Sequence, residues 1–87
     1  LLVAPPDLAH ASFPAELHSW RRFEGAGLPF AAVCITSSND PFDPAQAGAR
    51  MAAAWGARHV AAGPLGHING DSGLQAWDDG HRQLLTL

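Results

Sequence analysis

Two short polar motifs in this chain hold residue types that serve general acid–base chemistry. Asp40 lies in the segment SSNDPF, residues 37–42, and His67 lies in the segment GHIN, residues 66–69. A carboxylate that accepts one imidazole N–H fixes the tautomer of a histidine, whose other nitrogen can then take a proton from a hydroxyl group. The two motifs therefore predict an acid and a base that together activate a nucleophile.

The position of Asp40 suggests how its carboxylate would be held. It follows an apolar run at residues 30–36, and the ring of Pro41 favours extended backbone at the residue before it. This would place the carboxylate at the carboxyl edge of a sheet, where open α/β sheets bind their ligands. An Asx-turn or a helix cap is the alternative interpretation, because aspartate often takes these roles in turns.

The position of His67 matches that of Asp40 one strand later. Gly66 permits a sharp turn, which would aim the imidazole back over the sheet. A lone histidine in a loop is more often an ordinary surface residue. However, the two residues follow successive predicted strands, and adjacent parallel strands lie about 4.8 Å apart. Their order and spacing favour joint catalytic use of Asp40 and His67.

The elements that must position these residues alternate between strands and helices. Apolar runs predict short strands at residues 1–4, 30–36 and 58–62. The second run is apolar throughout rather than alternating, which is typical of a parallel strand covered on both faces. The sequence therefore predicts an α/β fold with a parallel sheet flanked by helices.

Helices are predicted after the second and third strands. Asp43 is placed to cap the first of them, with Pro44 at its first position and Gly56 at its end. Its apolar stripe consists of Ala47, Met51, Ala54 and Trp55. Asp78 and Asp79 suit the N-terminus of the last helix, where negative charge is stabilising. That helix receives its predicted apolar side from Leu84, Leu85 and Leu87.

The segment at residues 10–27 permits two interpretations. Its apolar residues at near-helical spacing are Phe13, Leu17, Trp20 and Phe23. Pro14 suits the first turn of a helix, so a helix is one interpretation. A hydrophobic loop that lies over a site is the other.

Composition argues against several classes of protein. The 87 residues carry a formal net charge of −3, so the chain has no basic surface with which to bind nucleic acid. Its longest apolar run, residues 28–35, is too short to span a membrane. Cys34 is the one cysteine and cannot form an internal disulfide, and a buried free thiol suits the cytoplasm.

The remaining polar residues offer weaker candidates for chemistry. A metal site from His59, His67 and an aspartate is disfavoured, because no histidine pair has the spacing of metal ligands. No serine lies in a Gly-x-Ser-x-Gly segment, so the serines are interpreted as turn and capping residues. Ser37 or Ser38 would at most brace the loop that carries Asp40.

Several segments resemble one family of enzymes. They are LLVAPPD, LPFAAVCITSSNDPF, AAWG, GHIN and SGLQAWDDG, which together cover much of the 87 residues. The chain resembles the C-terminal half of a small α/β-hydrolase-fold serine hydrolase of the retinoblastoma-binding protein 9-like family. The resemblance implies that Asp40 is the acid and His67 the base of a Ser-His-Asp triad. It also implies small ester-type substrates, no cofactor, and a role for Asn69, Trp77 and Gly80 in shaping the loop behind the histidine.

The order of a hydrolase triad implies that the nucleophile is missing from these residues. In α/β-hydrolases the nucleophile precedes the acid and the histidine, so it would lie upstream of Asp40. We therefore expect residues 1–87 to be the C-terminal half of a single domain. Its partner would be the N-terminal half, which supplies the serine and the oxyanion hole. The alternative is a non-catalytic protein–protein interaction module on a hydrolase-like scaffold, with an unpaired sheet edge near residues 1–4.

Overall fold

A parallel sheet lies at the centre of the computed structural model, which describes residues 1–21 and 25–87. Its strands are β1 (Leu2–Val3), β2 (Val33–Thr36) and β3 (Arg58–Ala61), in the order β1-β2-β3. Both pairings are parallel, and the register places Cys34 beside Leu2 on one side and His59 on the other. The predicted α/β architecture with a parallel sheet is therefore confirmed.

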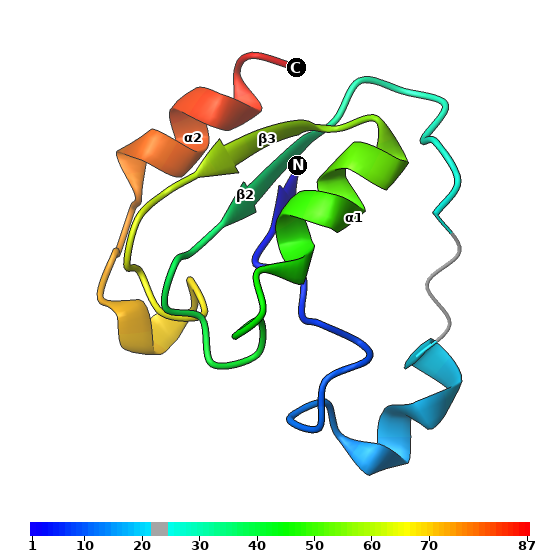
Figure 1. The fold of residues 1–87 in the computed structure, drawn as a ribbon. Coiled ribbons are helices and arrows are strands. Elements are labelled where there is room, and N and C mark those ends of the chain that lie inside the picture. The colour runs from blue at the N-terminus through cyan, green and yellow to red at the C-terminus, as the bar shows by residue number, and fades with distance from the viewer. Residues whose placement is uncertain (22–24) are drawn as a thin grey trace.

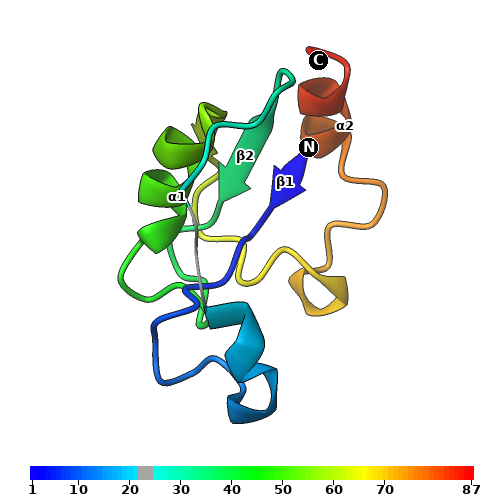
Figure 2. The same ribbon diagram turned by 90° about the vertical axis from the view of Figure 1, so that its right-hand side faces the viewer.

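Helices cover both faces of this sheet. Helix α1 (Ala47–Trp55) lies on one face and α2 (Asp78–Leu84) on the other, as Figures 1 and 2 show. Alternate residues of a strand point to opposite faces, and the contacts agree with that rule. Cys34 Sγ lies 4.0 Å from the carbonyl oxygen of Gly48 in α1. Arg58 on the opposite face donates from Nη2 to Thr86 Oγ1, just after α2, at 2.6 Å.

The middle strand forms the core. Val33, Cys34 and Ile35 are each at most 1% exposed, because neighbouring strands and a helix on each face enclose β2. Burial on both faces explains why this segment is apolar at every position. No helix within the described residues combines the length and apolar character that a membrane crossing would require.

Helix α1 begins later than the sequence predicted. It starts at Ala47 rather than Pro44, because Gln46 adopts left-handed backbone with φ of 56° and interrupts the helical path. Asp43 nevertheless serves the helix N-terminus. Its carboxylate accepts from the backbone N–H of Ala47 at 2.6 Å and of Gly48 at 2.9 Å. A buried carboxylate thus meets the unpaired N–H groups of the first turn. The predicted end at Gly56 is confirmed.

The described part of the segment at residues 10–27 does not form the α-helix that was one of its two interpretations. The described part contains the 3-10 helix η1 (Ala15–Arg21), which leaves helical geometry at Leu17 and lies away from the sheet in Figures 1 and 2. Phe13 is buried, but Leu17 is 44% and Trp20 69% exposed, so these side chains share no buried face. Phe23 lies outside the described residues.

Two other apolar segments are more exposed than predicted. Strand β2 begins at Val33, which pairs with Arg58, and not at residue 30 as predicted. Phe30, before the strand, is 65% exposed. The leucines near the C-terminus are also largely exposed, at 48% for Leu84, 70% for Leu85 and 48% for Leu87. They therefore do not form the buried apolar side that was predicted for the last helix.

Gly80 offers a direct test of packing around α2. A Cβ at this buried glycine would overlap the indole ring of Trp77, the residue before the helix. We expect Gly80→Ala to lower the free energy of unfolding by about 1–2 kcal/mol, because overpacking outweighs the gain in helix propensity. Chemical denaturation of the complete protein measures this effect. Gly70→Ala is the matched control, because its Cβ would meet open space. Equal midpoints for both variants would contradict the packing argument.

Candidate active site

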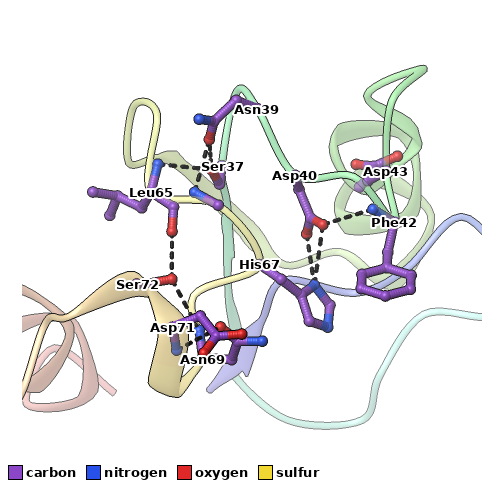
Figure 3. A network of polar contacts seen from close by, with 12 residues as sticks. Ser37, Asn39, Asp40, Phe42, Asp43, Leu65, His67, Asn69, Asp71 and Ser72 are labelled. Carbon is purple, nitrogen blue, oxygen red and sulfur yellow. Dashed lines mark hydrogen bonds and ion pairs between the residues drawn. The ribbon is translucent and has the colours of Figure 1, made fainter.

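The structure brings Asp40 and His67 together at one edge of the sheet. Asp40 lies in the loop after β2, and His67 lies in the loop after β3. His67 Nδ1 is 2.9 Å from Asp40 Oδ2 and 3.1 Å from Oδ1, as Figure 3 shows. The carboxylate side chain is 2% exposed and the imidazole 30% exposed. The pair therefore consists of a buried carboxylate and a histidine that still reaches solvent.

Local backbone contacts hold the carboxylate of Asp40. The N–H of Phe42 donates to Asp40 Oδ1 at 2.8 Å, and the N–H of Asp43 donates to the Asp40 carbonyl at 3.1 Å. The first contact is an Asx-turn, which the sequence offered as an alternative to catalytic use. The Asx-turn and the contact with His67 occur at once, because a carboxylate accepts several hydrogen bonds. The turn aims the side chain, and its oxygens remain able to meet His67.

The backbone on either side of His67 turns sharply. Gly66 has φ of 64° and Ile68 has φ of 49°, both in the left-handed region. The Phe42 ring lies against the imidazole, with centroids 4.6 Å apart and planes inclined by 55°. Among the described residues, every hydrogen bond of the His67 side chain involves Nδ1, and Nε2 points away from Asp40 in Figure 3. Nε2 is thus the nitrogen able to exchange a proton with a reacting group.

An open hollow adjoins the histidine. It has a volume of about 440 Å³, and its wall includes Phe42 and Leu65 as well as His67. The polar side chains of Asn69 and Asp71 also line it. A hollow with apolar walls and a few polar groups suits a small organic substrate. A second hollow of about 390 Å³ lies against α1, but no histidine lines it.

The described residues show no nucleophile aligned with His67. Burial, together with the nearby Asp43 carboxylate, raises the pKa of the Cys34 thiol, which makes it a poor nucleophile. Ser37 Oγ and Ser72 Oγ are hydrogen-bonded within loops, and Ser12 Oγ lies 2.9 Å from Nδ1 of its neighbour His10. Their contacts agree with the turn and capping roles that the sequence predicted.

The alternative metal site is not assembled in the part of the chain that the structure describes. No group of three or more His, Cys, Asp and Glu side chains is placed there to hold a metal ion. His59 Nε2 instead lies 2.7 Å from Thr36 Oγ1. Since His67 bonds to Asp40, these two histidines have separate partners.

One residue near the pair was missed by the sequence analysis. Asn39 Oδ1 accepts from the N–H of Gly66 at 2.7 Å, which links the Asp40 loop to the residue before His67. The only available signal was its place beside Asp40, because its partner lies 27 residues further along the chain. Asn69, which the resemblance implicated, caps the short 3-10 helix η2 (Gly70–Ser72) behind the histidine.

Comparison with known proteins agrees with this geometry. The family described as serine hydrolase matches residues 1–86. A solved structure that is similar is that of a protein from Pectobacterium atrosepticum described as a YdeN-like hydrolase, with 30% sequence identity and a TM-score of 0.71. The similarity covers 95% of this chain and 42% of that one, so the chain spans less than half the length of that hydrolase. No curated protein matches the chain in sequence. Since the family matches nearly every residue, the chain belongs to the serine hydrolase family.

Proposed function

We propose that this chain supplies the acid and the base of an esterase-type serine hydrolase. Asp40 is the acid and His67 the base of a Ser-His-Asp triad that hydrolyses ester bonds. The observation that carries the proposal is the contact of 2.9 Å between His67 Nδ1 and the buried Asp40 carboxylate, at the carboxyl edge of a parallel sheet. In α/β-hydrolases the acid and the histidine follow the nucleophile along the chain.

The mechanism that follows is acyl transfer through a covalent intermediate. A serine attacks the ester carbonyl while His67 Nε2 takes the hydroxyl proton and returns it to the leaving alcohol. Asp40 accepts the Nδ1–H, holds the imidazole in the required tautomer, and stabilises the imidazolium that forms. A water molecule then attacks the acyl carbonyl as it gives a proton to Nε2, and Nε2 returns this proton to the serine oxygen as the carboxylic acid leaves. These steps require no metal or organic cofactor.

The surroundings of the pair support this division of roles. The carboxylate of Asp40 is almost completely enclosed, so water competes little for the hydrogen bond to Nδ1. The Phe42 ring covers part of the imidazole and limits its rotation. The exposed part of His67 faces solvent, where a substrate and a nucleophile can approach.

The serine and the oxyanion-hole donors are proposed to come from an N-terminal half of the same domain. Support comes from the described hydrolase, of which this chain spans 42%, and from the lack of a Gly-x-Ser-x-Gly segment in the sequence. Residues 1–87 would then be the C-terminal half of one α/β-hydrolase domain. This half would be inactive alone, because it lacks the attacking serine.

The narrower family and the location are proposals of the same kind. The segments SSNDPF and GHIN support membership of the retinoblastoma-binding protein 9-like group. Small ester-type substrates follow from that resemblance and suit the hollow beside His67. The buried free thiol of Cys34 supports a cytoplasmic location.

A fluorophosphonate probe tests the proposed function by locating the reactive serine. The probe should label the complete hydrolase at one serine outside residues 1–87 and should leave the isolated 87-residue chain unlabelled. Peptide mapping of the labelled protein identifies the site, and heat-denatured protein is the control. Labelling of Ser12, Ser37 or any other serine of this chain would contradict the proposal.

A non-catalytic interaction module is the second candidate function. It is favoured by large apolar side chains on the surface, with Trp20 at 69% and Phe30 at 65% exposed. Exposed apolar side chains that gather in one patch are typical of surfaces that bind another protein. Ester hydrolysis by the complete protein, together with its labelling by the fluorophosphonate probe, would exclude this candidate. A stable complex with another protein, without hydrolysis or labelling, would support it.

A further inference from the structure

The loop of Asp40 is attached to the loop of His67 by side chains as well as by the catalytic pair. The N–H of Leu65 donates to Ser37 Oγ at 2.9 Å, and the N–H of Gly66 donates to Asn39 Oδ1 at 2.7 Å, as Figure 3 shows. These contacts join residues on either side of α1 along the chain. They engage the backbone N–H groups of the two residues that directly precede His67.

Ser37 and Asn39 act on these peptide groups as one unit. Ser37 Oγ donates to Asn39 Oδ1 at 3.0 Å while it accepts from Leu65. Asn39 Oδ1 therefore receives two hydrogen bonds, one from Ser37 and one from Gly66. Ser37 is 1% exposed, so a loss of its hydroxyl would leave the Leu65 N–H with only the carbonyl oxygen of Gly63, at 3.0 Å, as an acceptor in a poorly hydrated place.

The carbonyl group of Leu65 is held by a different residue, Ser72. Ser72 Oγ donates to the Leu65 carbonyl at 2.6 Å and accepts from the N–H of Asn69 at 3.2 Å. Leu65 is thus fixed through both its N–H and its carbonyl group. The chain then passes through the left-handed turn at Gly66 directly into His67.

We infer that Ser37 and Asn39 are positioning residues, which hold the backbone before His67 in the place where Nδ1 meets Asp40. The inference rests on the proposed function and deepens it. Neither residue is assigned a contact with the substrate or a reacting atom. Their effect passes through the peptide groups of Leu65 and Gly66, because small displacements of a catalytic group slow the chemical step strongly.

Substitution of Asn39 in the complete hydrolase tests the inference. With p-nitrophenyl acetate as substrate, Asn39→Ala should lower kcat by about tenfold and leave KM within about twofold, because orientation rather than binding is lost. Asn39→Asp should restore most of the activity, since a carboxylate oxygen can accept the same two hydrogen bonds. Ser38→Ala is the matched control, because the Ser38 side chain is exposed and has no hydrogen bond among the described residues. It should keep the wild-type kcat.

A second measurement reports on the loop without relying on activity. Amide hydrogen exchange at Gly66 should become faster in Asn39→Ala but not in Ser38→Ala, because only the first loses the acceptor for this N–H. Wild-type kcat in Asn39→Ala would overturn the inference. Unfolding of that variant would also overturn it, and so would a failure of Asn39→Asp to restore kcat. In either case Asn39 would stabilise the fold and not position His67. Full activity in His67→Ala would instead refute the proposed function, whatever the exchange at Gly66 shows.

Discussion

Replacement of His67 by alanine should lower kcat for ester hydrolysis by about 10⁶-fold in the complete hydrolase. The variant lacks the imidazole that Asp40 orients through Nδ1. This imidazole is 30% exposed, and its Nε2 has no hydrogen bond among the described residues. Without it, the serine hydroxyl loses its proton acceptor and the leaving alcohol loses its proton donor. Steady-state turnover of p-nitrophenyl acetate measures the loss.

A matched histidine variant separates this effect from a general loss of charge or structure. His81 is an exposed residue of α2, away from the pair, so His81→Ala should change kcat by less than about twofold. Normal activity in His67→Ala would refute the assignment of the base. A comparable loss in both variants would show that the assay responds to folding and not to chemistry.

Replacement of Asp40 by asparagine should lower kcat by about 10⁴-fold with little change in the fold. The amide has nearly the same shape and keeps an oxygen that can accept from the N–H of Phe42. Its NH₂ group would instead donate to His67 Nδ1, which places the proton on the wrong ring nitrogen and leaves Nε2 unable to accept one. Steady-state kinetics and circular dichroism of the complete hydrolase check both parts of this expectation.

The control for this variant is the same substitution at an exposed aspartate. Asp78 lies in the first turn of α2, so Asp78→Asn should leave kcat unchanged and lower the stability by less than about 1 kcal/mol. A kcat within tenfold of wild type in Asp40→Asn would mean that the carboxylate only forms its Asx-turn. The double variant Asp40→Asn/His67→Ala should be no slower than His67→Ala, because residues that act as a unit are not additive.

Much of the fold was accessible from the pattern of apolar residues. Continuous burial of β2 requires an apolar residue at each of its core positions, and this pattern in the sequence predicts a parallel strand covered on both faces. The stop of α1 at Gly56 was also predictable, because the left-handed backbone there, with φ of 68°, suits glycine. Signals of this kind are local, so the sequence carries them directly.

Other features depend on contacts that a local pattern does not contain. The start of α1 at Ala47 depends on the left-handed turn at Gln46 and on the buried carboxylate of Asp43. The exposure of Leu17 and Trp20 follows from where η1 lies relative to the sheet. Spacing along the chain offered a helix as one of two interpretations there, but spacing does not specify which surface is available for packing.

For the candidate site, the sequence by itself determined the order of an acid and a histidine at the ends of successive strands. Tertiary structure alone decided that Asp40 and His67 meet, that the same carboxylate also forms an Asx-turn, and that Asn39 reaches Gly66. These contacts join residues 27 positions apart, or depend on the exact turn of a loop. Residue types and order are written in the chain, whereas distances between loops arise only when β2, α1 and β3 pack together.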